Sequence, residues 1–261
     1  MGVTKEWVMD VEESRREEWI RERLSNQELD EWSEEWQELE AEFHNYQDFL
    51  ADMAQEEYEE QQWLKQNPHT VIYDSAINIL QEIKEEAKQH KSEVFIKMQI
   101  SYSITIMESC LSEMLKSVAL SNERYVIHAI QNIKKLSDKS IPITDLLVKE
   151  NTASKYVQDY LSDILYHKIL SVVEIYKAVL QPKKYKGISL KDVLSLTKLR
   201  HDIVHRNGKS LNGEIHTFNS ASLDAAFKTV NEFPTHMKDL ISDAVEQHES
   251  EQISRDLNDE F

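Results

Sequence analysis

Arginine and histidine side chains gather in one short segment of the chain, which we call the basic motif: Arg200-His201-Asp202-Ile203-Val204-His205-Arg206-Asn207-Gly208. The permanent positive charge of arginine can bind the oxygen atoms of a phosphate, and histidine exchanges protons near neutral pH. A histidine can remove the proton from the 2′-hydroxyl of RNA, whose oxygen then attacks the adjacent phosphorus, while arginine stabilises the charge that develops on the phosphoryl oxygens. This chemistry needs no metal ion and no cofactor. Because DNA lacks the 2′-hydroxyl, this chemistry predicts RNA as the substrate.

The spacing of Arg200 and His205 indicates that one helix alone does not complete such a site. The two residues are five positions apart, which corresponds to about 140° around an ideal helix, so they lie on neighbouring faces. We therefore expect a second helix or a second copy of the chain to complete the pocket. This predicts a homodimer in which the motif helices face each other.

The composition predicts an all-α protein with a buried core. The 261 residues include only four Gly and four Pro, too few for the turns of a β-rich domain, whereas helix-forming residues are plentiful. Hydrophobic residues make up 40% of the chain, which is enough for a core. Cys110 is the single cysteine, so no intrachain disulfide can form. No uncharged stretch approaches the ~18–20 residues of a membrane span, and we expect a cytoplasmic protein that does not contact a membrane.

Charge divides the chain unequally. Residues 1–64 contain 21 Asp/Glu and five Lys/Arg, a net charge of −16, whereas Gln181 to Ser210 contains eight Lys/Arg and two Asp, a net charge of +6. All five Trp lie between positions 7 and 63. We predict that residues 1–65 form an acidic, Trp-rich helical segment that either docks a protein partner or covers the RNA site as an autoinhibitory arm. A solvated acidic face is the plainer alternative.

Within residues 1–65 we expect a helix from Trp7 to Leu24 and a second helix that starts at Ser25, where Ser25 and Glu28 form a capping box. Apolar residues then alternate in steps of three and four at Leu29, Trp32, Trp36, Leu39, Phe43, Tyr46, Leu50 and Met53. This heptad spacing predicts a seam that packs on another helix, either of a partner or of its own domain. Asn67-Pro68 is expected to end the helix.

Residues 70–247 are predicted to form a helical bundle. We expect helices at 70–90, 92–119, 122–138 and 153–180, one that carries the basic motif, and one at 220–247. The helix at 92–119 is apolar on nearly every side and is the expected core. Ser189 with Asp192 should cap the motif helix, Asn207-Gly208 should end it in a left-handed turn, and Pro234 should kink the last helix. Ile141-Pro142 should break the chain between helices, and residues 248–261 are predicted to be a polar tail.

The order of these features resembles the HEPN superfamily, whose Arg-(four to six residues)-His motif is matched by Arg200 and His205. The apolar early helix with Met107-Glu108-Ser109, the long middle helix, Gly208 and the closing helix agree with it over roughly residues 70–247. The resemblance implies an antiparallel all-α bundle that acts as a homodimeric, metal-independent endoribonuclease in growth arrest, as a toxin, or in antiviral defence. It implies that Arg200 holds the scissile phosphate, that His205 is the general acid/base and that His201 orients or assists. We predict further substrate-binding residues at Lys198, Arg206, Asn207 and Lys209, and supporting residues at Glu108 and Asp202.

Other interpretations remain open. His201 and His205 have the i, i+4 spacing of two zinc ligands, which would suit a metal hydrolase. Asp202 points away from the pair, but His216 and His236 could approach it in space. The chain could also be a catalytically inactive helical interaction or dimerisation protein, because cations stabilise the C-terminal end of any helix. Glu108 either pairs with a cation of the motif region or marks where its helix reaches the surface. With Gly only at positions 2, 187, 208 and 213, no phosphate-binding Gly-rich loop is possible, which argues against an ATP- or dinucleotide-binding enzyme.

Overall fold

The computed structural model describes residues 3–89, 92–140, 152–185 and 187–259. Over these ranges the chain forms ten helices and one isolated β-bridge, between Lys209 and Ile215, and no β-strand. The predicted all-α fold is therefore confirmed. No helix in the described part of the chain is long and apolar enough to cross a membrane. The chain divides into two compact units, Met1–Trp63 and Leu64–Phe261.

In the first unit, helix α1 (Val3–Arg21) and the start of helix α2 (Glu34–Gln66) pack around a small apolar cluster. Ile20, Leu24 and Trp36 are buried in this cluster. Trp19 and Phe43 extend it in an edge-to-face contact with ring centroids 5.5 Å apart. The sequence therefore produces a helix pair whose aromatic residues face each other near the turn.

The turn between α1 and α2 differs from the prediction. The expected helix start at Ser25, with a Ser25–Glu28 capping box, is wrong, because both Ser25 polar groups bind the Glu35 carboxylate instead. The Ser25 backbone N–H donates to Glu35 Oε1 at 2.7 Å, and its hydroxyl donates to Oε2 at 2.6 Å. These hydrogen bonds hold the chain in a turn, and α2 begins only at Glu34.

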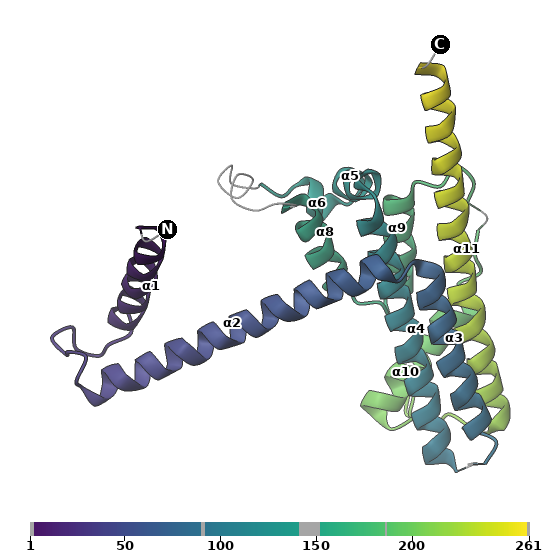
Figure 1. The fold of residues 1–261 in the computed structure, drawn as a ribbon. Helices are drawn as coiled ribbons and strands as arrows, with labels where there is room; N and C mark the ends of the chain where they lie inside the picture. The colour runs from purple at the N-terminus through teal and green to yellow at the C-terminus, as the bar shows by residue number, and fades with distance from the viewer. Residues whose placement is uncertain (1–2, 90–91, 141–151, 186, 260–261) are drawn as a thin grey trace. The chain divides into compact units, whose positions relative to one another are not determined.

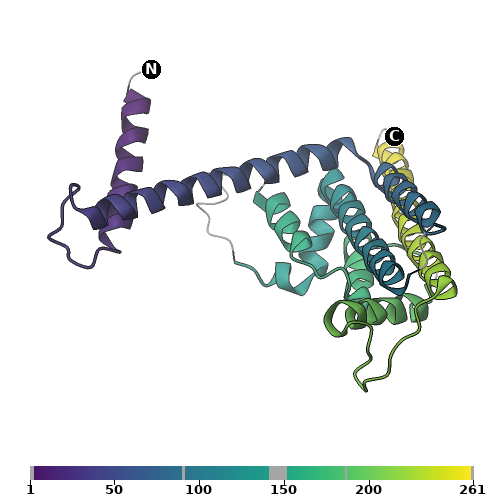
Figure 2. The same ribbon diagram turned by 90° about the horizontal axis from the view of Figure 1, so that it is seen from below.

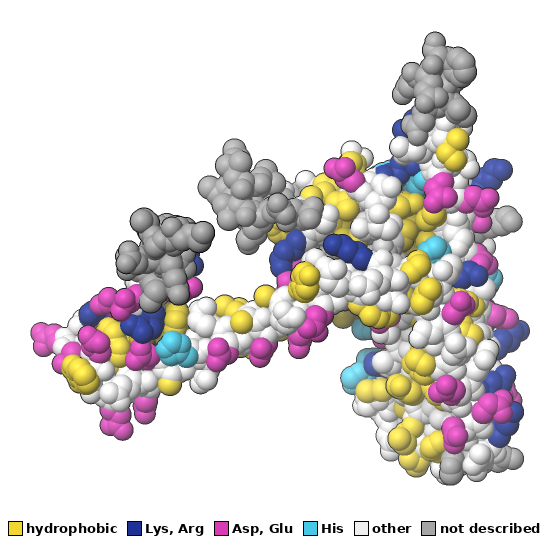
Figure 3. All heavy atoms as spheres, in the orientation of Figure 1, with side chains coloured by type: hydrophobic (Ala, Val, Ile, Leu, Met, Phe, Trp, Pro, Cys, Tyr) yellow, Lys and Arg dark blue, Asp and Glu magenta, His cyan; other side chains and the backbone are white. Residues whose placement is uncertain are grey.

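The predicted apolar seam is buried over only part of its length. Trp36 is buried and Leu39 and Phe43 are half-buried, but Trp32 is 83% exposed. Farther along α2, the remaining seam residues are exposed: Tyr46, Leu50 and Met53. Figure 3 shows hydrophobic and acidic side chains exposed along this helix, mostly on opposite edges. The seam therefore packs on α1 near the turn and remains uncovered beyond it.

In the second unit, three helices lie side by side: α3 (His69–Glu86), α4 (Glu93–Ser121) and α11 (Ser220–Asp259) (Figures 1 and 2). Helix α4 has buried residues on nearly every turn, so the predicted core helix is confirmed. Its start is fixed by the Ser92 hydroxyl, which accepts a hydrogen bond from the Phe95 N–H at 3.3 Å. Pro68 lies at the N-cap of α3, as expected from the predicted break.

Five shorter helices complete the second unit: α5 (Glu123–Asn132), α6 (Lys134–Ser137), α8 (Thr152–Ser162), α9 (Ile169–Leu180) and α10 (Lys191–Arg206). The single helix predicted at 153–180 is wrong, because the chain leaves the helix after Ser162. Tyr166 in the gap is buried, and its hydroxyl donates to the Leu161 carbonyl at 3.0 Å. The helix predicted at 122–138 is likewise interrupted, at Ile133, whose backbone is extended. The break predicted at Ile141-Pro142 lies outside the described residues.

The closing helix is longer than predicted. Pro234 lies inside α11, and the helix continues to Asp259, so it extends beyond the end predicted at residue 247 and includes most of the segment predicted as a polar tail. Contacts with α5 and the loop after α9 explain the extension. The ring of His248 is buried against Tyr125, and Glu251 forms ion pairs with Arg124 at 3.9 Å and with Lys183 at 2.6 Å.

Candidate active site

Helix α10 carries the basic motif in its last turns and ends as predicted. Asn207 has a left-handed φ of 52°, and Gly208 follows with a φ of 83°. The Gly208 N–H donates to the Asp202 carbonyl at 2.9 Å, which satisfies a carbonyl that the end of the helix leaves free. The predicted cap at the start of α10 is wrong, because Leu190 rather than Ser189 occupies the N-cap position and no side chain caps it.

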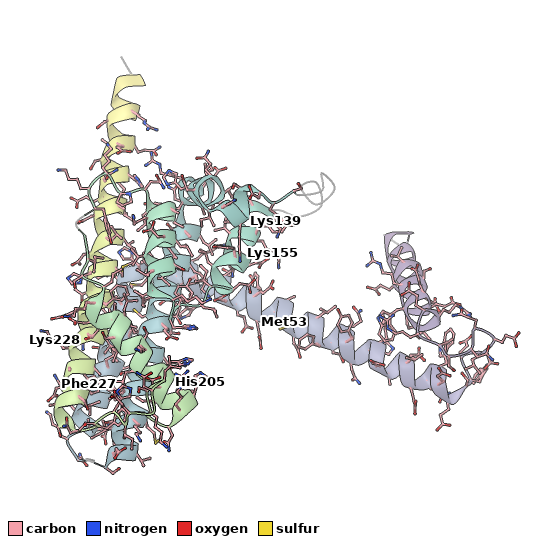
Figure 4. All side chains as sticks on the ribbon, turned by 180° about the vertical axis from the view of Figure 1, so that it is seen from behind. Met53, Lys139, Lys155, His205, Phe227 and Lys228 are labelled. Atoms are coloured by element: carbon pink, nitrogen blue, oxygen red, sulfur yellow. The ribbon has the colours of Figure 1, made fainter. Side chains whose placement is uncertain are left out.

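The predicted catalytic residues lie on the outer part of α10. His201 and His205 are exposed, and their ring centroids are 4.6 Å apart with 45° between the ring planes. Figure 4 shows His205 projecting from the surface of the helix. Arg200 is half-buried, and its Nε atom has no hydrogen-bond partner among the described residues. The helix therefore combines two accessible imidazoles with a guanidinium whose Nε atom is buried and unpaired among the described residues.

The predicted substrate-binding residues differ in how accessible they are. Lys198, Asn207 and Lys209 are exposed. Arg206 is half-buried and is already engaged, because its Nη1 atom lies 2.7 Å from Asp202 Oδ1. A ligand at the end of α10 would therefore meet Lys198 and Lys209 as exposed cations, and Arg206 only through the part of its guanidinium that Asp202 leaves open.

Asp202 anchors the end of α10 to the segment that follows. Its side chain is only 1% exposed, and His216 Nε2 lies 2.9 Å from its Oδ2 atom. The hydrogen bonds from His216 and from Arg206 hold the pKa of Asp202 below its usual value, against the opposing effect of burial. The carboxylate is therefore ionised at neutral pH. The sequence indicated only that Asp202 supports the site, and its partner His216 lies 14 residues farther on.

Lys97 on α4 is a residue of this site that the sequence did not reveal. Its ammonium group donates to the Asn207 carbonyl at 3.3 Å and forms an ion pair with Glu93 at 2.7 Å. It also lies 4.9 Å from the centroid of the Phe218 ring. No spacing rule relates Lys97 to a residue 110 positions away, so only the fold reveals this contact.

Glu108 on α4 lies in the same electrostatic environment as Arg200. Burial raises the pKa of the Glu108 carboxyl above its ordinary value of 4.5, while the positive charges of Arg200 and His167 act in the opposite direction. Its Oε1 atom is buried without a hydrogen-bond partner among the described residues. Glu108 thus interacts with a cation of the motif region, Arg200, through charge. The effect of burial on the pKa of Glu108 is larger than the effect of this charge.

This balance predicts how Glu108 affects stability with pH. Because burial raises the pKa above the unfolded value of 4.5, the ionised carboxylate destabilises the folded state as the pH rises through that value. Glu108→Gln is therefore expected to raise the midpoint of thermal unfolding at pH 7, and the gain should disappear below about pH 4. Glu86→Gln, on the exposed end of α3, is the matched control. A midpoint lowered by Glu108→Gln at pH 7 would show that the charge interaction with Arg200 outweighs burial.

The metal-site interpretation lacks a third ligand on this part of the fold. His201 and His205 are close enough to share a ligand, but Asp202 is already engaged by Arg206 and His216. Among the residues that the structure describes, no group of three or more His, Cys, Asp or Glu side chains is arranged to hold a metal ion.

No family model matches the chain, and no curated protein and no solved structure is significantly similar to it.

Proposed function

We propose that this protein is a metal-independent endoribonuclease of the HEPN type that acts in growth arrest or anti-phage defence. One observation carries the proposal: the last turns of α10 present two surface histidines in mutual contact and carry a half-buried arginine. An imidazole can move protons at neutral pH, and a guanidinium can bind two phosphate oxygens at once. This combination suits RNA cleavage by attack of the 2′-hydroxyl.

In the proposed reaction Arg200 binds the scissile phosphate, and His205 takes the proton from the 2′-hydroxyl. The 2′-oxygen attacks phosphorus, the bond to the 5′-oxygen breaks, and the products are a 2′,3′-cyclic phosphate and a 5′-hydroxyl. His201, in contact with the ring of His205, orients it. Lys198 and Lys209 are exposed and bind neighbouring phosphates of the strand, which makes binding dependent on salt.

A second copy of the chain completes this site in our proposal, because α10 turns Arg200 and His205 to different faces. An exposed apolar stripe next to α10 supports this arrangement. Val94, Met98 and Tyr102 follow one another along one face of α4 and are 68%, 62% and 56% exposed. Helix α10 packs on α4, and Lys97 within this stretch reaches the end of α10. Contiguous apolar surface of this kind is typical of protein interfaces.

Met98→Glu is therefore expected to weaken the homodimer and RNA cleavage together. Losing a central interface residue costs about 2 kcal/mol or more, which corresponds to an increase of roughly 30-fold in the dimer dissociation constant. Sedimentation and initial cleavage rates measured over the same range of protein concentration test this. Val71→Glu, an exposed apolar position on α3, is the matched control. A Met98→Glu protein that stays dimeric would exclude this stripe as the interface.

The proposal is tested by incubating the full-length protein with total RNA in the presence of EDTA. Cleavage that leaves cyclic phosphate ends is the expected result. Cleavage that EDTA stops would instead support a metal hydrolase, with His201 and His205 as ligands.

A second candidate function is favoured by an observation in the first unit. Tyr46, Phe49, Leu50 and Met53 occupy one face of α2 and are all exposed. Such a face is suited to a partner helix, so the chain would then be a catalytically inactive helical interaction protein. RNA that stays intact with and without metal ions, together with a stable protein complex, would favour this function.

A further inference from the structure

The basic motif contains a second arrangement for proton transfer, centred on Asp202. The Asp202 side chain is almost fully buried, whereas the His216 side chain that binds it is 35% exposed. A buried carboxylate that accepts a hydrogen bond from one ring nitrogen fixes the orientation of an imidazole and stabilises its protonated form. With Nε2 directed to Asp202, Nδ1 is the nitrogen that remains for a ligand. Asp202 and His216 therefore form a carboxylate–imidazole dyad, in which the buried carboxylate orients a partly exposed ring.

The backbone also fixes His216 against the end of α10. The His216 N–H donates to the Gly208 carbonyl at 3.0 Å, and the Ser210 N–H donates to the Glu214 carbonyl at 2.8 Å. The β-bridge between Lys209 and Ile215 closes the same short hairpin. Two independent constraints, one on the backbone and one on the ring, thus hold this imidazole in place.

Asp202 of this pair and His205 both belong to the last turns of α10. Asp202 and His205 are three residues apart on α10, which makes their side chains neighbours on one face of a helix, roughly 5–6 Å apart at Cβ. His216, bound to Asp202, therefore lies close to the turn that carries His205. By contrast, Arg200 and Asp202 are about 200° apart around the helix, which agrees with a site that two copies of the chain complete together.

We propose that His216, oriented by Asp202, is the general acid of the cleavage reaction and that His205 is the general base. This inference rests on the proposed ribonuclease function. As the 2′-oxygen bonds to phosphorus, His205 accepts the 2′-hydroxyl proton. As the phosphorus–5′-oxygen bond breaks, protonated His216 gives its proton to the leaving 5′-oxygen. The proton gained by one histidine balances the proton lost by the other, so no cofactor or co-reactant is consumed.

The leaving group provides the test. In the full-length protein, His216→Gln keeps an amide N–H that can donate to Asp202, so the connection between the hairpin and α10 is retained while proton transfer is lost. We expect His216→Gln to slow cleavage of an RNA oligomer by about 10²–10⁴-fold. The same oligomer with sulfur in place of the 5′-bridging oxygen has a leaving group that needs no proton. We expect this substrate to lose less than about tenfold.

Two further variants sharpen the test. His205→Gln should slow both substrates, because the general base is needed for either leaving group. His236→Gln, at an exposed histidine of α11, should slow neither. If His216→Gln does not fold, Asp202→Asn replaces it, because an amide cannot stabilise the protonated imidazole and should give the same selective loss.

The outcomes separate the two proposals. If the wild-type protein cleaves RNA but His216→Gln, or Asp202→Asn in its place, slows both substrates equally or slows neither, the general-acid role of His216 is overturned and the ribonuclease function stands. If the wild-type protein cleaves neither substrate, the ribonuclease function itself is overturned.

Discussion

Arg200→Ala and His205→Ala are each expected to lower the rate of RNA cleavage by about 10²–10⁴-fold. His205 is exposed, so its replacement removes a proton-transfer group and little packing. Arg200 is half-buried and its positive charge acts on the buried carboxyl of Glu108, so its replacement by Ala is expected to lower stability as well. The effect of His205→Ala should therefore appear in the rate and not in the fold, whereas Arg200→Ala should lower the rate and also the midpoint of thermal unfolding.

Initial cleavage rates, with circular dichroism and thermal unfolding of the same samples, measure this prediction. His236→Ala on α11 is the matched control, because it also removes an exposed imidazole. Arg200→Lys separates charge from shape, since an ammonium group keeps the positive charge and loses the planar fork that binds two phosphate oxygens. Full activity in both Arg200→Ala and His205→Ala would remove the case for an enzyme at this site.

The largest expected effect on stability comes from Gly208→Ala. Gly208 has a φ of 83°, and a Cβ atom placed there would lie 2.7 Å from Phe218 Cε2. A left-handed backbone costs a residue with a side chain about 1–2 kcal/mol, and forcing extra volume against a packed ring costs about 1–3 kcal/mol more. We expect the free energy of unfolding to fall by the sum of these effects, roughly 2–5 kcal/mol.

Gly213→Ala is the control for this change, because Gly213 has nearly the same φ, 82°, and no atom within 4 Å of its ideal Cβ position. It should therefore show only the backbone cost, about 1–2 kcal/mol. Denaturant titration of both variants compares the two. Equal losses would mean that the close approach of Phe218 to Gly208 does not contribute to stability. Gly208→Ala should also reduce the rate of RNA cleavage, because the Gly208 carbonyl accepts the hydrogen bond that holds His216.

The elements that the sequence predicted correctly are those that have local signals. Pro68 marks the start of α3, the continuous apolar run marks α4 as the core, and Asn207-Gly208 marks the end of α10. Each signal depends on only a few neighbouring residues, so it can be recognised in the sequence without knowledge of the fold. The candidate catalytic residues Arg200, His201 and His205 were chosen from a signal of the same local kind, and their role remains a proposal.

The incorrect predictions concern contacts between distant parts of the chain. The break before α9 contains no Gly or Pro, and it depends on the burial of Tyr166. The last turns of α11 look like a polar tail, but they bind Arg124 and Lys183. The predicted capping box of Ser25 and Glu28 agreed with the local sequence, but Ser25 instead forms its hydrogen bonds with Glu35. Lys97 joined the candidate site only through the fold, and the fold also showed that His216 binds Asp202.

The most direct measurement compares two oligomers of the same sequence in the presence of EDTA, one of RNA and one with a single 2′-deoxyribose at the mapped cleavage position. The wild-type protein is expected to cut the RNA to a 2′,3′-cyclic phosphate and to leave the substituted linkage intact. Cleavage of both linkages, or of neither, would contradict a reaction in which His205 activates the 2′-hydroxyl beside a phosphate bound by Arg200.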